Sequence, residues 1–266
     1  MAITTCRQGT MEYLVADGIG APHGFTTRLG GVSKGELDSL NLGMHRGDER
    51  SNVEENYKRL AKAIGFDLEK LVLTRQTHSD IVRKVTFADA SGLDNHSYPE
   101  CDALITNTPE TALIVFSADC TPVLFHDPVT GAVGAAHAGW RGTAAKIAAK
   151  TAKAMCDAYG CKPEDIRAAI GPNIGACCFE TDADVPEAMV KAFGKTAESY
   201  IVPKGNKYYV NLKELNALSL REAGVTHIEI AEECTVCQHH RFWSHRVTGG
   251  NRGSQGAVIV CKEGSR

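Results

Sequence analysis

The residues best able to do chemistry in this sequence are two histidines and one cysteine that lie beside small or turn-forming residues. His78 ends a Gln-Thr-His run, Cys120 lies within Ser117-Ala-Asp-Cys-Thr-Pro122, and His137 opens His137-Ala-Gly-Trp-Arg-Gly142. Two imidazoles and one thiolate can hold a divalent metal and leave its fourth position free for water or substrate, as catalytic zinc sites do. Structural zinc sites usually take ligands in close pairs, whereas these three residues are 42 and 17 positions apart. The spacing therefore predicts an enzyme whose metal site assembles when separate strands meet.

The other cysteines are expected to be reduced, because no secretory signal points to an oxidising compartment. Cys234-Thr-Val-Cys237 has the spacing of half a zinc or redox site, but no second CxxC completes it. We interpret Cys234 and Cys237 mainly as packing thiols, with a structural zinc site or a redox pair as the alternatives. Cys177 and Cys178 are sequence neighbours, and we do not expect them to bond to each other.

Length and composition indicate a globular protein. The chain has 266 residues and no evident linker, so we expect one domain covering residues 1–266. Lys and Arg total 29 against 32 acidic residues, for a net charge of -3, which argues against a general nucleic-acid binder. Residues 1–18 lack the apolar run of a secretory signal, and the longest apolar run, 112–116, is far short of the roughly 20 residues of a membrane helix. We expect a cytoplasmic protein without membrane or nucleic-acid partners, and the oligomeric state stays open.

The elements that must position the reactive residues are strands and helices in irregular order. Strands are predicted where aliphatic, β-branched or aromatic residues run between turn signals, at 12–16, 23–28, 70–75, 80–87, 112–117, 123–126, 132–136, 166–170, 227–231 and 257–261. Helices are predicted behind a Ser51 and Glu54 capping box up to Gly65, from a Thr143 cap to Tyr159, near 185–193, and from an Asn211 cap to Ala223. Strands often follow one another without a helix between them. An α+β layered α/β sandwich with mixed β-sheets therefore fits better than a doubly wound parallel fold.

This arrangement places each candidate ligand at the end of a strand. His78 falls at a turn between the predicted strands 70–75 and 80–87, and Cys120 falls in the tight connection after 112–117. His137 follows strand 132–136, and Arg141 lies near the start of the next helix, where anions are favoured.

Eight motifs follow in order along the chain: Gly24-Phe-Thr-Thr-Arg-Leu-Gly-Gly-Val-Ser33, Asn41-Leu-Gly43, Gln76-x-His78, Ala118-Asp-Cys-x-Pro122, His137-Ala-Gly-Trp-Arg-Gly142, Ile170-Gly-Pro172, Cys178-Phe-Glu180 and Phe242-Trp-Ser-His-Arg246. Together they closely resemble the bacterial laccase-domain family, whose members are also called polyphenol oxidases, purine nucleoside phosphorylases or peptidoglycan editing factors. The resemblance implies zinc bound by His78, Cys120 and His137, and a layered fold shared with cytotoxic-necrotizing-factor-type domains. Two positions depart from the pattern: Ser79 stands where glycine is common, and Arg46 where a small apolar residue is usual.

The resemblance also implies an activity, namely phosphorolysis of adenosine, inosine, guanosine and S-methyl-5'-thioadenosine, with adenosine deamination beside it. Cys120, Arg141, Asp119 and Gln76 are the candidate catalytic residues. Arg141 or the Gly30-Gly31 turn could bind phosphate, and Gln76 and Asp119 could orient the metal ligands or the substrate. The candidate substrate-binding residues lie in two glycine-containing loops: Gly30, Gly31, Ser33, Asn41 and Arg46.

Three other functions stay open. Copper can replace zinc at an N/S site, which would allow phenol oxidation, but none of the ten histidines forms the His-x-His pairs that a multicopper cluster needs. Cys120 and His137 could instead act without metal as a nucleophile and its base, for example to remove a misplaced L-serine from a cell-wall precursor. A zinc-stabilised interaction module is the non-enzymatic alternative.

Overall fold

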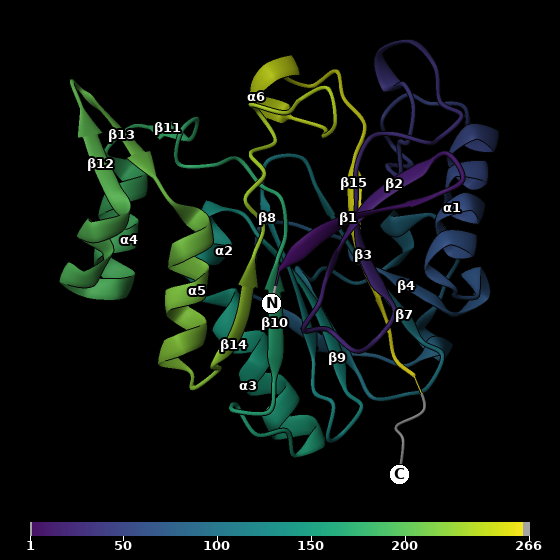
Figure 1. Ribbon diagram of the computed structural model, residues 1–266, viewed down its shortest axis with the longest axis horizontal. Coiled ribbons are helices and arrows are strands. Elements are labelled where there is room, and N and C mark those ends of the chain that lie inside the picture. The colour runs from purple at the N-terminus through teal and green to yellow at the C-terminus, as the bar shows by residue number, and fades with distance from the viewer. Residues whose placement is uncertain (1, 263–266) are drawn as a thin grey trace.

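In the computed structural model of the protein, which describes residues 2–262, two six-stranded sheets pack face to face (Figure 1). In spatial order, the first sheet contains β1 (Ile3–Gln8), β2 (Met11–Ala16), β3 (His23–Thr26), β15 (Gln255–Val260), β7 (Ala112–Ser117) and β4 (Leu71–Leu73). The second contains β14 (His227–Ile230), β10 (Arg167–Ile170), β8 (Thr121–His126), β9 (Val133–Ala138), β6 (Ala103–Thr106) and β5 (Val82–Lys84).

Both sheets are mixed. Most neighbouring strands run antiparallel, and the parallel pairs lie at the edges, where β4 joins β7, β5 joins β6 and β14 joins β10. The predicted α+β layered sandwich with mixed sheets is therefore confirmed. Residues 112–115 of β7 are all buried, because this strand is covered on both faces, which explains its continuous apolar run.

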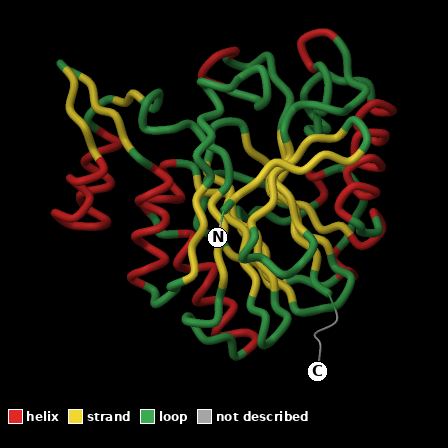
Figure 2. The backbone as a smooth tube through the Cα atoms, viewed as in Figure 1, coloured by secondary structure: helices red, strands yellow, loops and turns green. Residues whose placement is uncertain are grey.

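Helices cover the outer faces of the sandwich (Figures 1 and 2). On one side lies α1 (Arg50–Ile64); on the other lie α3 (Ile147–Tyr159), α5 (Leu212–Glu222) and α4 (Asp184–Phe193). A small third sheet of β11 (Glu180–Thr181), β13 (Lys207–Val210) and β12 (Ile201–Lys204) packs beside α4. The short helices are α2 (Trp140–Ala144), α6 (His245–Thr248) and the 3-10 turns Gly35–Leu37, Leu68–Lys70, Phe87–Asp89, Asn95–Ser97 and Gly194–Tyr200. Within residues 2–262, none of the helices has the length and apolar character needed to cross a membrane.

The buried apolar side chains explain these layers. One cluster joins the two sheets and α1, and includes Tyr57 of α1, Leu113 of β7 and Leu124 of β8. A second cluster packs α3 and α5 on the second sheet, where Met155 and Leu220 meet strand residues such as Phe125. Each buried leucine or phenylalanine side chain contributes about 1.5–3 kcal/mol, so the apolar faces of the helices determine where they dock.

The helix predicted up to Gly65 is confirmed as α1, but its predicted capping box is wrong. Gly65 ends the helix in a left-handed conformation, as expected. At the other end the helix begins at Arg50, so Ser51 already lies within the first turn and caps nothing. The Asp48 carboxylate accepts from the Glu49 backbone N–H at 2.9 Å instead, and Glu54 pairs with Arg50 at 2.8 Å.

The single long helix predicted from Thr143 to Tyr159 is also wrong. The chain forms α2 and then α3, because Lys146 between them adopts a left-handed conformation at φ 57°. Thr143 lies inside α2, and its hydroxyl accepts a hydrogen bond from Asn216 of α5 at 2.9 Å. The strands β1, β6, β11, β12 and β13 were not predicted, whereas the Asn211 cap of α5 is confirmed.

Candidate metal centre

The three candidate ligands meet because the chain crosses twice between the two sheets, each time from the carboxyl end of one of the parallel neighbours β4 and β7. β4 belongs to the first sheet and β5 to the second, and His78 lies in the segment between them. β7 and β8 are likewise in different sheets, and Cys120 lies in their connection. His137 lies near the end of β9, opposite Pro122 of β8. The expected convergence of distant segments therefore takes place where the sheets are joined.

The donor atoms have the separations that a tetrahedral metal requires. One donor atom from each of His78, Cys120 and His137 lies within 4.8 Å of the others. Sγ of Cys120 is 3.9 Å from Nε2 of His78, and the two imidazole centroids are 5.0 Å apart. Ordinary zinc–sulfur and zinc–nitrogen bonds place these atoms about 3.6 Å apart in a tetrahedron. The residues therefore fit a divalent ion such as zinc with little movement.

A buried carboxylate that the motifs do not include holds both histidines. Oδ1 of Asp102 lies 2.8 Å from Nδ1 of His137. Hydrogen bonds from His137 and Ser79 outweigh burial and lower the pKa of Asp102 to about 2, so this oxygen can only accept. Nδ1 of His137 therefore keeps its proton, and Nε2 is the nitrogen that would bind a metal.

The same carboxylate shapes the turn that carries His78. It accepts hydrogen bonds from the backbone N–H groups of Thr77, His78 and Ser79 at 3.1, 3.1 and 2.7 Å. His78 is thereby held at φ 60°, a conformation that non-glycine residues rarely adopt. Ser79 adds a hydroxyl donor at 2.7 Å, so the serine that departs from the family pattern strengthens this network.

Charge within the ligand group favours a thiolate. Burial alone would raise the pKa of Cys120, but the His137 imidazolium and hydrogen bonds from both imidazoles lower it. Burial alone would likewise lower the pKa of His137, but the Cys120 thiolate and Asp102 raise it. A thiolate is the form of cysteine that binds metals and attacks electrophiles.

The ligands open into a cavity of about 360 Å3, a size typical of small-molecule sites. Its apolar wall includes Leu73, Leu93 and Phe116, and its polar wall includes His45, His96, Arg46, Arg75 and Arg252. The cavity thus places the candidate metal ligands beside several cationic groups.

Two of these cations have no acidic partner. Arg75 pairs with Glu100, whereas neither Arg46 nor Arg252 forms an ion pair with any carboxylate in residues 2–262. Burial lowers the pKa of both, and repulsion from Arg46 lowers that of Arg252 further, to about 10. Two neighbouring, partly buried guanidinium groups of this kind have the charge and the donor groups needed to bind an anion.

Gln76 and Asp119, predicted as catalytic, both make hydrogen bonds that hold strands or loops in place. The Gln76 amide lines the cavity, but it exchanges hydrogen bonds of 2.6 and 2.8 Å with the backbone of Phe116. Asp119 lies at φ 86° and accepts from Thr235 at 2.6 Å and from the Arg246 backbone at 2.7 Å. Its buried carboxylate therefore anchors the turn that presents Cys120.

Only one of the five predicted substrate-binding residues lines the cavity. Arg46 lines the cavity, whereas Gly30, Gly31, Ser33 and Asn41 do not. Asn41 and Ser33 both donate to Asp48, at 3.0 and 2.6 Å, and so brace the loop that carries Arg46.

The Gly30-Gly31 turn is needed for close packing. A Cβ on Gly30 would lie 2.3 Å from the Thr10 carbonyl oxygen, and one on Gly31 would lie 2.1 Å from that of Ser39. The turn is thus packed against neighbouring backbone, at a place that the cavity does not reach.

Arg141 lies outside the cavity. Its guanidinium stacks 4.2 Å from the Trp140 ring centroid, at a shallow hollow between α2 and α4. The cavity is lined instead by Arg252, which none of the sequence motifs includes. Asp102 was missed as well, although a charged residue directly before the apolar run 103–105 is a usable signal for a functional carboxylate.

Known proteins share this architecture. The family described as Multi-copper polyphenol oxidoreductase laccase matches residues 22–262. Purine nucleoside phosphorylase YlmD of Geobacillus stearothermophilus is 39% identical over 250 residues, which cover 92% of this chain and 91% of that protein. Purine nucleoside phosphorylase YlmD of Bacillus subtilis is 36% identical over 246 residues, which cover 90% of this chain and 88% of that protein. The crystal structure of YlmD from Geobacillus stearothermophilus superimposes with a TM-score of 0.91 at 37% identity, over 97% of this chain and 98% of that one. The predicted laccase-domain fold is thereby confirmed.

Proposed function

The chain belongs to the multi-copper polyphenol oxidoreductase laccase family, and from that premise we propose that it is a zinc-dependent purine nucleoside phosphorylase. The proposed substrates are adenosine, inosine, guanosine and S-methyl-5'-thioadenosine, with adenosine deamination as a second activity. Relatives named purine nucleoside phosphorylase support the reaction class.

One observation carries the proposal. The cavity that contains His78, Cys120 and His137 also contains Arg46 and Arg252, which have no acidic partner in the described part of the chain. Phosphorolysis needs a phosphate beside the reacting carbon, and a pair of guanidinium groups can bind and orient this anion. Oxidation of a phenol has no need for such an anion site.

The remaining wall suits a nucleoside. Leu73, Leu93 and Phe116 offer an apolar surface on which a flat purine could pack. His45 and His96, with ring centroids 3.9 Å apart, offer hydrogen-bonding groups at the same cavity. Binding a base and a phosphate together would position the phosphate for attack on the sugar carbon and exclude water from it.

The metal ligands would hold zinc, which supplies a Lewis acid for the polarisation of a substrate or water oxygen. Asp102 keeps the proton of His137 on Nδ1 and fixes the ring, so that Nε2 stays directed at the ligand group. The Cys120 side chain provides negative charge that balances part of the positive charge in the cavity.

The test is a product assay with the purified protein. Adenosine with phosphate should yield adenine and ribose 1-phosphate, and adenosine without phosphate should yield inosine only. A Cys120→Ser variant is the control for a contaminating enzyme and should yield neither product. If the unaltered protein forms neither adenine nor inosine, the proposal is wrong.

Three further measurements separate the alternatives. Loss of activity with a chelator and recovery with zinc would reject the metal-free Cys120 and His137 hydrolase. Phenol turnover at stoichiometric zinc and without copper would favour the oxidase. In the described residues, however, only one group of candidate metal ligands contains imidazoles, which is too few for a multicopper cluster. A Cys120→Ala variant that folds but is inactive would reject the purely structural module.

A further inference from the structure

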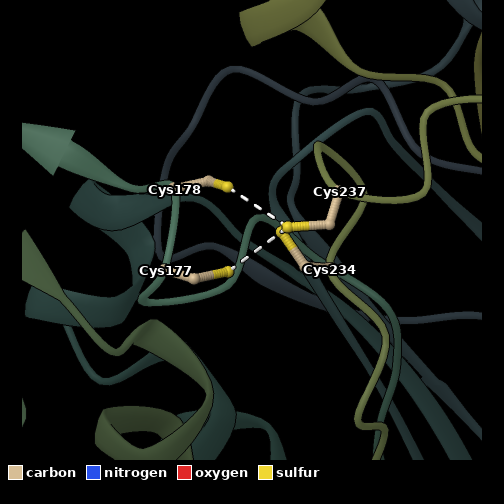
Figure 3. A group of neighbouring side chains, drawn as sticks. All are labelled: Cys177, Cys178, Cys234 and Cys237. Atoms are coloured by element: carbon tan, nitrogen blue, oxygen red, sulfur yellow. Dashed lines mark hydrogen bonds between the residues drawn. The ribbon is translucent and has the colours of Figure 1, made fainter.

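Four cysteines converge at a second place in the molecule, away from the cavity. Cys177 and Cys178 lie in the loop between β10 and β11, and Cys234 and Cys237 lie in the loop that follows β14 (Figure 3). The CxxC that looked incomplete in the sequence therefore meets a second pair of thiols.

Strand pairing brings the two loops together. β10 and β14 are parallel neighbours, with Ile170 opposite Ile230. The loops that follow them therefore begin side by side, at the carboxyl ends of the two strands. The pairing continues at the bridge between Asn173 and Cys234, where the Thr235 N–H donates to the Asn173 carbonyl at 2.9 Å. The convergence of the four thiols is thus fixed by the backbone.

The sulfur atoms have the spacing of a tetrathiolate. All four lie within 4.8 Å of one another, with Cys177 to Cys237 at 3.6 Å and Cys178 to Cys237 at 3.4 Å. Zinc–sulfur bonds of about 2.3 Å place the sulfurs of a tetrahedron about 3.8 Å apart. A disulfide would need a pair at about 2.05 Å, and all four cysteines are free thiols. Figure 3 shows the side chains of the two loops directed toward one another.

The surroundings suit a bound cation with thiolate ligands. The Gly175 N–H donates to Sγ of Cys234 at 3.2 Å, a contact that stabilises a thiolate. The buried Lys213 ammonium donates to the carbonyls of Ala231 and Glu233, in the segment that leads to Cys234. Its positive charge lies near the cluster and would balance part of the negative charge of the thiolates.

We propose that Cys177, Cys178, Cys234 and Cys237 bind a structural zinc ion, separate from the metal centre of the cavity. Four thiolates fill the tetrahedral shell and leave no position for substrate, as in structural sites, and soft sulfur ligands select zinc over hard cations.

The zinc ties together loops that support Cys120. Thr235, next to Cys234, donates to the Asp119 carboxylate at 2.6 Å, and the Ile174 N–H donates to the Asp119 carbonyl at 2.9 Å. Both loops joined by the four cysteines therefore hold the turn in which Cys120 lies.

The test is metal analysis of the full chain purified with reductant and without chelator. Cys237 is exposed, so Cys237→Ser is the mildest variant. It should hold one zinc equivalent less than the unaltered protein, whereas Cys6→Ser, a thiol of β1 outside both groups, should lose none. Cys120→Ser should lose metal from the cavity and keep the tetrathiolate zinc, so failure of the proposed activity and failure of this site are distinguishable.

A second measurement leaves all four cysteines of the cluster in place. After replacement of zinc by cobalt, the Cys120→Ser protein should show the sulfur-to-cobalt charge-transfer bands of four thiolate ligands. Full zinc retention in Cys237→Ser would overturn the site. The absence of these bands would also overturn the site. A mass of the denatured protein that is lower by two hydrogens for each disulfide among these cysteines would overturn it as well.

Discussion

Asp102 and His137 are joined by a hydrogen bond of 2.8 Å between Oδ1 and Nδ1, and both side chains are almost fully buried. Asp102 follows the His78 turn by more than 20 positions and precedes His137 by 35. It lies directly before β6, whereas His137 belongs to the neighbouring strand β9. Because the same carboxylate also accepts from the 77–79 backbone, a single residue orients two of the three candidate metal ligands.

Asp102→Asn should weaken zinc binding by about 10- to 100-fold, the usual effect of losing a carboxylate behind a histidine ligand. An amide has one acceptor oxygen where the carboxylate has two, so it cannot accept all the hydrogen bonds that Oδ1 and Oδ2 of Asp102 accept from His137 and the 77–79 turn, and its NH2 group would face N–H donors. Competition with a chromophoric chelator would measure the affinity. Asp127→Asn is the matched control, because Asp127 is a buried acid that accepts from backbone N–H groups at the opposite end of β8. Equal zinc affinity in the two variants would contradict the assigned role of Asp102.

Arg252→Gln and Arg46→Gln should each raise the KM for phosphate by about 10- to 100-fold, because a hydrogen bond to a charged group contributes about 1.5–3 kcal/mol. Initial rates at varied phosphate and saturating nucleoside would measure the effect. Arg141→Gln is the control and should leave this KM unchanged, since Arg141 stacks on Trp140 outside the cavity. A phosphate KM that responds to Arg141 alone would place the anion site elsewhere.

The sequence indicated the candidate metal ligands more clearly than the residues that support them. His78, Cys120 and His137 stand beside turns and small residues, and this local pattern marks them. Asp102 reaches His137, and Arg252 reaches the cavity, only when segments that are distant in the sequence meet, and neither has a local signal of comparable strength. The break between α2 and α3 was missed for a related reason: Lys146 takes a left-handed conformation that sequence patterns assign to glycine.

The four-cysteine cluster shows the same limit. Cys234-Thr-Val-Cys237 was visible as half a site, but its partners lie in a loop that is more than 50 positions earlier. Only the parallel pairing of β10 with β14 brings the two halves together. In the sandwich, β7 was predicted from its long apolar run, whereas β6, with four residues between polar neighbours, was missed.

Stability should fall in mild acid because of His126. Burial and the neighbouring Arg167 lower its pKa to about 4, and Nδ1 accepts the Gly20 N–H at 3.2 Å, which a protonated ring could not do. In the unfolded chain, His126 binds a proton with a pKa of about 6.5, whereas the folded chain resists this protonation. The stability that the neutral ring contributes is therefore fully present above about pH 6.5 and is lost as the pH falls toward 4. Because the ring is partly exposed, we expect a loss on the order of 2 kcal/mol.

His126→Gln keeps an acceptor for the Gly20 N–H and removes the titration. Urea unfolding of both proteins at several pH values between about 7 and 4.5 should give a smaller decrease for the variant. A residual decrease is expected from His23, whose pKa burial also lowers, and nearby Asp127 acts in the opposite direction on His126. Parallel curves for the two proteins would show that His126 does not contribute.

Gly171→Ala should destabilise the protein by about 1–3 kcal/mol through overpacking. A Cβ at this position would lie 2.3 Å from Cδ1 of Phe25, a fully buried ring on β3 of the first sheet, whereas Gly171 follows β10 of the second. Gly250→Ala is the control and should change stability by less than about 0.5 kcal/mol, since no atom lies within 4 Å of its added methyl group.

The steric origin of this effect can be tested directly with a third variant. Phe25→Leu removes the ring edge that the alanine methyl would strike, so the double variant with Gly171→Ala should lose less stability than the sum of the two single losses. The expected coupling is about 1 kcal/mol, within the range measured for residues in contact. Urea unfolding of the four proteins in the cycle would measure it. Strict additivity would mean that Gly171 is required for its backbone conformation and not for the close approach of the two sheets.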